Sequence, residues 1–339
     1  MSATQERYLV TGALGCIGAW TVRSLVRQGA AVTTFDLGTD TRRLAQIMTP
    51  DELATVELVA GDITDLTAVR AALDDHDVTH VIHLAALQVP FCRADPPLGA
   101  MVNVVGTVNV FEAVKARGDG MAPVVYTSSI GMFAADDSDP VTGRLEVDAR
   151  PHPANHYGVY KLANEGNARV YWLDDGIPSV GLRPMVVYGV GRDQGMTSGP
   201  TKAIVAAVLG RPYTVPYGGA TLYQYAEDAA HILIAASRSG ATGAGIYNMP
   251  GTLVDGPGLV AAIEAAVPEA TGQIDIAPVH LPFPEDIASD GIEVLGPLPI
   301  TPFVDGVRQS VAIYRELAAA GRLDGAAHGL EAPAATAGG

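Results

Sequence analysis

Several things are scarce in this chain, and each scarcity excludes a class of protein. Only two cysteines, Cys16 and Cys92, occur in 339 residues, so a disulfide framework and a four-cysteine zinc site are both excluded. We find no apolar stretch of the roughly 18 residues that a membrane span needs. The polar residues 1–7 run directly into an expected strand and do not form a signal peptide. We therefore expect a cytoplasmic protein with no membrane partner.

Basic residues are also few. The chain has 21 Lys and Arg against 37 Asp and Glu, for a formal net charge of −16 at pH 7. Because phosphates would be repelled by this charge, nucleic acid and anionic membrane are excluded as partners. Hydrophobic residues make up 48% and charged residues 17% of the chain, which is typical of a globular protein with a sizeable core.

The first half of the chain alternates short β-branched runs with longer helical patterns. This alternation predicts an α/β fold, a doubly wound parallel sheet of the Rossmann type with helices on its faces. The expected strands and helices occupy residues 8–10, 17–28, 31–35, 56–60, 80–84, 98–117, 123–127, 157–172 and 179–182.

A glycine-rich turn, TGALGCIG, joins the first expected strand to the first helix. Gly12 permits the tight turn, Gly15 lets the backbone approach a pyrophosphate, and Gly18 lets the helix pack against the strand. The first helical residues, Cys16 and Ile17, offer backbone N–H groups at the positive end of the helix dipole. The turn therefore predicts a dinucleotide-binding site.

An acid then selects between the two nicotinamide dinucleotides. Asp36 ends the second expected strand, 18 residues beyond Gly18, where a carboxylate accepts both ribose hydroxyls of an adenosine and repels a 2′-phosphate. We therefore expect NAD as the cofactor. Arg42 and Arg43 follow shortly after and keep NADP open as an alternative.

Two later strand ends suit the same cofactor. Asp62 and Ile63 follow the third expected strand, where an acid can meet the adenine edge. Leu84, Ala85 and Ala86 end the fourth, where small residues leave room for the dinucleotide. All five are candidate cofactor contacts.

The organisation beyond the sheet is less regular. After about residue 190 glycine and proline become frequent, residues 245–249 read as a late strand, and residues 307–320 as a terminal amphipathic helix. We expect an NAD-binding domain, a substrate-binding lobe and a flexible tail. Their bounds are residues 1–189, with the sheet completed by about 226–250; residues 190–225 and 251–322; and residues 323–339.

A tyrosine and a lysine supply the chemistry. Tyr157 and Lys161 are four residues apart on an expected helix and share one face. The ammonium, together with an oxidised nicotinamide, favours the phenolate form of the tyrosine, so that it can act as a base near neutral pH. Thr127 ends the fifth expected strand, and Ser128 or Ser129 can hold the substrate oxygen.

The chain closely resembles the extended short-chain dehydrogenase/reductase family, the NAD-dependent epimerase/dehydratase group. The resemblance implies that Tyr157 is the general acid or base, that Lys161 is its electrostatic partner and that Ser129, rather than Ser128, orients the substrate. It also implies that the cofactor contacts Asn103, Thr127, Pro184 and Val187. The motifs that carry the resemblance are residues 11–18, Asp62-Ile63, residues 83–86, residues 103–107, Ser128-Ser129, Tyr157 with Lys161, residues 183–189 and residues 302–315.

Departures from the family narrow the reaction. Its dehydratases carry an acid pair directly after the catalytic hydroxyl, where this chain has Ile130 and Gly131. Its nucleotide-sugar epimerases have an Asn in place of Val186 and an Arg in the stretch matching residues 220–225, which here contains no Arg. A pyrophosphate without its cation is poorly held, although other basic residues could substitute: Arg192, Lys202 or Arg211.

These departures favour a small substrate without a nucleotide. Its expected contacts are Gln88, Ser129 and a later loop that carries Arg192, Thr197 and Ser198, and Arg192 can pair with a carboxylate. No metal site is expected, because the loop histidines near Tyr157 have no third ligand.

The sequence thus predicts an NAD-dependent dehydrogenase that takes a hydride from a hydroxyl carbon of a sugar, sugar acid, polyol or hydroxy acid. An NAD-dependent sugar or nucleotide-sugar epimerase is the first alternative, and a non-catalytic NAD-sensing binder the second. The family resemblance also implies a homodimer through residues 98–117 and 157–172, where Val110 and Val170 would face outward.

Overall fold

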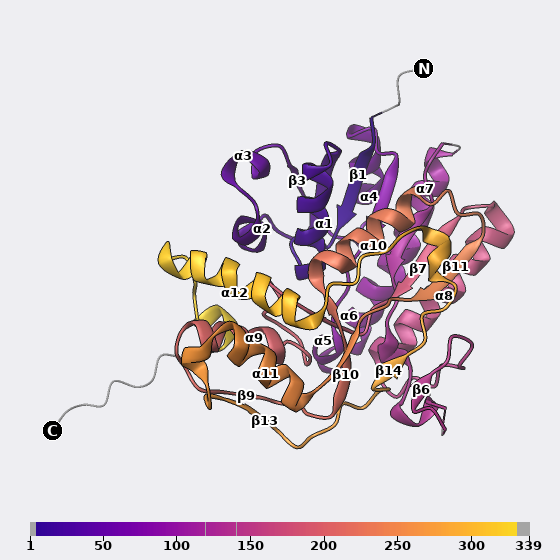
Figure 1. Cartoon of the computed structure of the whole chain (residues 1–339). Helices are drawn as coiled ribbons and strands as arrows, with labels where there is room; N and C mark the ends of the chain where they lie inside the picture. The colour runs from indigo at the N-terminus through magenta and orange to yellow at the C-terminus, as the bar shows by residue number, and fades with distance from the viewer. Residues whose placement is uncertain (1–4, 119, 140, 331–339) are drawn as a thin grey trace.

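A seven-stranded parallel sheet forms the centre of the molecule (Figure 1). The computed structural model describes residues 5–118, 120–139 and 141–330. The strand order is β11-β7-β5-β4-β1-β2-β3, and every neighbouring pair is parallel. The predicted Rossmann-type sheet is confirmed. The strands are β1 (Arg7–Thr11), β2 (Ala31–Asp36), β3 (Glu57–Ala60), β4 (His80–His83), β5 (Val124–Thr127), β7 (Ser179–Arg183) and β11 (Ala244–Asn248).

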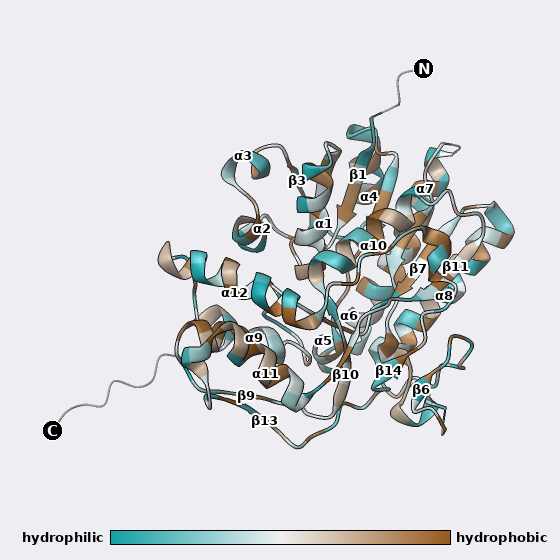
Figure 2. Ribbon diagram, in the orientation of Figure 1, coloured by the Kyte–Doolittle hydropathy of each residue, from teal (hydrophilic) through white to brown (hydrophobic). Residues whose placement is uncertain are grey.

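Helices cover both faces of this sheet, as parallel strands require. Helices α1 (Cys16–Arg27) and α10 (Ala226–Arg238) pack together on one face. Helices α4 (Leu66–Asp75), α7 (Gly106–Arg117) and α8 (His156–Asp175) lie on the other face, where α7 contacts both of its neighbours (Figure 1). In Figure 2 strand β1 is brown, and exposed helix faces such as those of α12 carry bands of teal, so the apolar residues lie mainly between the layers.

The helix expected over residues 98–117 is divided into three parts: α6 (Pro96–Ala100), a π-helical turn (Met101–Val105) and α7. The wider turn contains Asn103, whose side-chain amide binds both the N–H and the carbonyl of Leu87. The continuous run Pro96–Arg117 is long and apolar enough to cross a membrane by length and composition, with half of it buried. The expectation that no apolar stretch reaches that length was therefore wrong, because the run mixes apolar and small residues around two asparagines.

The second half of the chain is more regular than its glycine and proline content indicated. A three-stranded sheet joins β8 (Val186–Tyr188), β10 (Ala220–Tyr225) and β12 (Thr252–Asp255). Pro200 and Pro257 lie in the first turns of α9 and α11, where a missing N–H and a fixed φ favour a helix instead of breaking it. The remaining α-helices and strands of the described residues are α9 (Gly199–Val208), α11 (Gly256–Ala266), α12 (Phe303–Ala319), α2 (Arg42–Ile47), α3 (Pro50–Leu53), α5 (Val89–Ala94), β6 (Arg144–Leu145), β9 (Tyr213–Val215), β13 (Ile274–Ile276) and β14 (Asp286–Ile287).

The expected tail is packed along its first part. His328 and Leu330 are buried, and Arg211 donates a hydrogen bond to the Leu330 carbonyl at 2.9 Å. The prediction of a loose tail was therefore wrong for residues 323–330, and residues 331–339 lie outside the described residues.

One apolar cluster joins the sheet to the later part of the chain. Trp20 of α1, Tyr188 of β8 and Tyr314 of α12 are all fully buried in it. Trp20 also donates its indole N–H to the Val190 carbonyl at 2.9 Å, and Tyr314 accepts from the Gly191 N–H at 3.3 Å. The loop after β8 is thereby held at the start of α1.

Candidate active site

A cavity of about 580 Å³ opens at the carboxyl ends of the sheet strands. The chain runs outward from β1 to β3 and then returns to β4 on the other side of β1, and this reversal is where α/β sheets bind nucleotides. Asn103, Thr197 and Ser198 do not line the cavity. The other predicted site residues do: Gly12, Gly15, Cys16, Ile17, Gly18, Asp36, Asp62, Ile63, Leu84, Ala85, Ala86, Gln88, Thr127, Ser129, Tyr157, Lys161, Pro184, Val187 and Arg192.

The three glycines of the turn have different surroundings. Gly12 has φ +65°, and a Cβ there would lie 2.6 Å from the Ala85 nitrogen. A Cβ on Gly18 would lie 2.4 Å from the Gly12 carbonyl oxygen. Gly15 is different: an added Cβ would meet only that same oxygen, at 3.2 Å, and would otherwise project into the cavity.

The start of α1 is open toward the same space. Its N-cap is Gly15, and no side chain caps its first N–H groups. Uncapped N–H donors and a helix dipole facing a glycine-lined hollow suit the pyrophosphate of a dinucleotide. The residues present therefore fit NAD.

Asp36 stands at the end of β2 beside this turn. One carboxylate oxygen accepts the Leu14 N–H at 3.0 Å and the other accepts the Leu37 N–H at 2.9 Å. The carboxylate is thus held in place while it lines the cavity. Each oxygen has a second lone pair for a ribose hydroxyl.

Arg42 and Arg43, which left NADP as an alternative cofactor, each form an ion pair with an aspartate. Arg42 lies 3.3 Å from Asp40. Arg43 binds the buried Asp193 through Nη2 and Nε at 2.8 and 3.1 Å, and its Nη1 donates to the Leu14 carbonyl at 2.9 Å. No sequence signal indicated the Arg43–Asp193 pair, because 150 residues separate its members.

Two predicted cofactor contacts serve the walls of the cavity instead. Asn103 is buried, and its amide binds the Leu87 backbone and Cys92. It shapes the segment that follows β4 and does not face the ligand space. The Asp62 carboxylate lines the cavity but already accepts the N–H and hydroxyl of Thr64, both at 2.8 Å.

Helix α8 brings the catalytic candidates to the end of β5. Lys161 is buried, and its ammonium donates to the Thr127 carbonyl at 2.7 Å. Its Nζ lies 5.6 Å from the centre of the Tyr157 ring. Gly131 lies between Ser129 and Tyr157, since a Cβ there would be 3.2 Å from Ser129 Oγ and 3.4 Å from a carbon of the Tyr157 ring. The serine, tyrosine and lysine therefore lie close together where they line the cavity.

Burial shifts the pKa values of Tyr157 and Lys161 in opposite directions. It raises the pKa of Tyr157, and a hydrogen bond with Ser129 opposes that rise. It also lowers the pKa of Lys161 from 10.5 to about 8. The lowering of the tyrosine pKa was expected from Lys161 and an oxidised nicotinamide acting together; in the protein alone, loss of water is the largest influence on this pKa and raises it.

Ser128 points to a different partner. Its hydroxyl donates to the buried Glu165 at 2.6 Å, and Arg183 binds both oxygens of the same carboxylate at 2.7 Å. Glu165 is one helical turn beyond Lys161, so α8 contacts Thr127 and Ser128 in succession through these two residues. The Ser128 hydroxyl is thus engaged inside the protein, which leaves Ser129 to face the cavity.

Arg192 is the basic residue on the opposite wall. Its Nη2 donates to the Thr197 hydroxyl at 3.1 Å, but its Nε is buried without a hydrogen-bond partner. No carboxylate lies within 4.0 Å of it in the described part of the chain. Thr197 and Ser198 are buried behind the wall, so they support the arginine loop rather than touch a ligand.

Arg192, Lys202 and Arg211, the basic residues that could replace the missing pyrophosphate-binding arginine, differ in their access to the cavity. Lys202 and Arg211 do not line the cavity, and Arg211 is bonded to the Leu330 carbonyl. In the stretch Ala220–Tyr225 all residues but the first are buried. Only Arg192 of the three can reach a cavity ligand.

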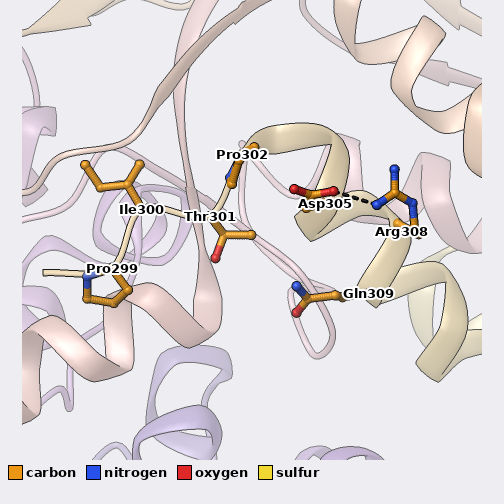
Figure 3. Close-up of a pocket in the computed structure, with 7 residues that line it drawn as sticks. All are labelled: Pro299, Ile300, Thr301, Pro302, Asp305, Arg308 and Gln309. Carbon is orange, nitrogen blue, oxygen red and sulfur yellow. Dashed lines mark hydrogen bonds and ion pairs between the residues drawn. The ribbon is translucent and has the colours of Figure 1, made fainter.

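The other chemically suggestive residues lie outside this arrangement. Cys92 is buried against the Leu87 carbonyl, and the described residues contain no cluster of three His, Cys, Asp or Glu side chains that could hold a metal. A second hollow lies at the start of α12 (Figure 3), where its charged residues, Asp305 and Arg308, already pair with each other at 2.6 Å.

Comparisons with known proteins identify a family of NAD-dependent enzymes. A family model described as the NAD dependent epimerase/dehydratase family matches residues 8–249. A UDP-glucose 4-epimerase of Mycolicibacterium smegmatis is 29% identical over 321 residues, which are 91% of this chain and 98% of that protein. UDP-glucuronate 4-epimerase 2 of Arabidopsis thaliana is 32% identical over 187 residues, 53% of this chain and 42% of that protein.

The solved structures include a UDP-glucose 4-epimerase of Thermus thermophilus in complex with NAD. It is 27% identical, with a TM-score of 0.75, and the match covers 91% of this chain and 99% of that one. The Mycolicibacterium protein is matched over nearly its full length, but the chain spans only about half the length of other curated relatives that it matches.

Proposed function

Because this chain belongs to the NAD-dependent epimerase/dehydratase family, we propose that it takes a hydride from a hydroxyl carbon of a small, acidic, carbohydrate-like substrate. The predicted family, the predicted cofactor NAD and the prediction of an enzyme are confirmed by this membership. The substrate and the fate of the hydride are proposals.

The proposed chemistry follows from the protonation of the site. When bound, NAD accepts the hydride from the carbon that bears the hydroxyl. Tyr157 exchanges a proton with the substrate oxygen, and Ser129 donates a hydrogen bond to that oxygen as charge develops on it. Lys161, whose pKa of about 8 leaves it mostly charged at pH 7, supplies the positive charge that favours the phenolate.

The observation that carries the proposed substrate class is the unpaired Arg192. A half-buried guanidinium with a buried, unpartnered Nε favours an anionic ligand, because an unsatisfied donor is costly to bury. Among the described residues, the Arg43 charge on the same cavity is neutralised by Asp193. One available cation suits a sugar acid or hydroxy acid better than a nucleotide diphosphate.

The family's epimerases support a second candidate, in which the hydride returns to the other face of the same carbon. The curated relatives reported above are epimerases of UDP-sugars, which favours this candidate over the dehydrogenase. The missing arginine in Ala220–Tyr225 favours the dehydrogenase. Both candidates use Tyr157, Lys161 and Ser129 in the same way.

A substrate panel separates the two. Sugars, aldonates, uronates, hydroxy acids and UDP-sugars are each incubated with the enzyme and NAD, while NADH absorbance and product stereochemistry are followed. A dehydrogenase accumulates NADH, and an epimerase converts its substrate without net NADH. Arg192→Met should raise the KM for acids about ten-fold or more and leave that of neutral substrates unchanged. Arg211→Met is the matched control, and equal activity on neutral sugars would refute the acidic substrate.

We propose that the protein forms a homodimer, through an interface that differs in part from the one expected from the sequence. Val110 is buried in the core and was wrongly expected to face outward, whereas Val170 is 50% exposed. Leu98, Met101 and Val159 are also exposed on helical segments that contact one another, and such a patch favours association. Light scattering that gives a monomer mass at micromolar concentration would refute it. The cytoplasmic location stays a prediction.

A further inference from the structure

Arg43 and Asp193 form an ion pair that the proposed reaction does not use. Asp193 is 6% exposed and lies in the loop after β8, while Arg43 comes from α2, and both residues line the cavity. All three guanidinium nitrogens are engaged, two of them by the Asp193 carboxylate and the third by the Leu14 carbonyl.

This guanidinium lies close to the acid expected to select NAD. Leu14 connects them directly: its N–H donates to Asp36, and its carbonyl accepts from Arg43. NADP differs from NAD only by a phosphate on the adenosine 2′ oxygen, which is the position that an acid at the end of β2 reads. An arginine beside that acid is the side chain best suited to bind such a phosphate, because its donors match two phosphate oxygens.

We propose that Asp193 is a second determinant of cofactor specificity, which holds Arg43 in an ion pair and so withholds it from a 2′-phosphate. Asp36 repels the phosphate, and Asp193 removes the cation that would attract it. The loop that carries Asp193 is held from two sides, because Val190 accepts a hydrogen bond from Trp20 of α1 and Gly191 donates one to Tyr314 of α12. The proposal rests only on NAD dependence, and it holds whichever substrate is turned over.

Equilibrium binding tests this without turnover. Calorimetry measures the affinity for NAD, NADP, and the fragments AMP and adenosine 2′,5′-bisphosphate, on the full-length protein. Asp36→Ala alone should improve NADP binding modestly. Adding Asp193→Ala should improve binding of NADP and of the bisphosphate by a further ten-fold or so, the ratio expected from a hydrogen bond to a charged group. NAD and AMP affinities should change much less.

Two controls separate this from a general charge effect. Asp74→Ala removes an acid that pairs with Arg117 outside the cavity, and it leaves the ion pairs of Arg42 and Arg43 in place. It should not reproduce the gain. Arg43→Met, added to the Asp36→Ala and Asp193→Ala pair, should abolish the gain, because no released guanidinium remains.

The proposal is overturned if Asp74→Ala gives the same gain, if Arg43→Met leaves the gain in place, or if Asp193→Ala gives none in a folded protein. A thermal melt checks folding, since Asp193→Ala leaves a partly buried arginine unpaired. If that variant does not fold, Asp193→Asn removes the charge but keeps one acceptor oxygen. A smaller gain in the same direction is then expected, and no gain from that folded variant likewise refutes the proposal.

Discussion

Without cofactor, the stability of the Lys161→Met variant relative to wild type should be greater at pH 7 than at high pH. The variant should also lose activity. The lysine is buried, and its pKa falls from 10.5 to about 8 on folding. Below pH 8 the folded protein therefore carries a buried charge that the unfolded chain keeps in water. At ~1.4 kcal/mol per pKa unit, this penalty is about 3 kcal/mol at pH 7.

The sign of the pH dependence follows from proton counting. Between the folded and unfolded pKa values, about 8 and 10.5, the unfolded chain binds more protons than the folded one, so this group makes the wild type more stable as pH rises. The penalty is reduced to roughly 1 kcal/mol near pH 9.5. Methionine has no such charge. The stability difference between Lys161→Met and wild type should therefore change by about 2 kcal/mol between pH 7 and about pH 9.5.

Urea unfolding at the two pH values measures this change. The variant also loses the hydrogen bond to the Thr127 carbonyl, but that loss is independent of pH and cancels in the comparison. Lys202→Met, on α9 and outside the cavity, is the control and should show a constant difference. If the difference for Lys161→Met is also constant with pH, the lysine is not a buried charge and the reasoning fails.

Three further predictions concern the same site and its support. Tyr157→Phe should lower kcat at least ~10²-fold with NAD affinity nearly unchanged, because only the proton-transferring hydroxyl is lost; a folded variant that keeps a tenth of the rate would contradict this. Ser129→Ala should lower kcat less, since it removes one hydrogen bond to the substrate oxygen, as steady-state kinetics of the two variants can compare. Glu165→Gln should destabilise the protein by about 3–5 kcal/mol in urea unfolding, because it leaves Arg183 buried without its counter-charge; a loss below ~1 kcal/mol would show that the pair is not structurally important.

Local sequence patterns were enough for the nucleotide-binding half. The turn between β1 and α1, the acid at the end of β2 and the tyrosine four residues before a lysine each act through neighbours in the chain or on one helix face. Their chemistry is set by short-range geometry, so the fold class, the cofactor and most of the cavity lining could be predicted before the structure was known.

Longer-range packing decided the rest. Sequence spacing could not show that Asp193 neutralises Arg43, or that the Ser128 hydroxyl turns to Glu165, because these partners are brought together only by the folded sheet and its loops. Burial likewise raises the pKa of Tyr157 in the protein alone and hides Val110. Local geometry can be read from residue order, whereas desolvation and ion pairing depend on which distant segments exclude water from a group, and the tertiary structure alone determines that.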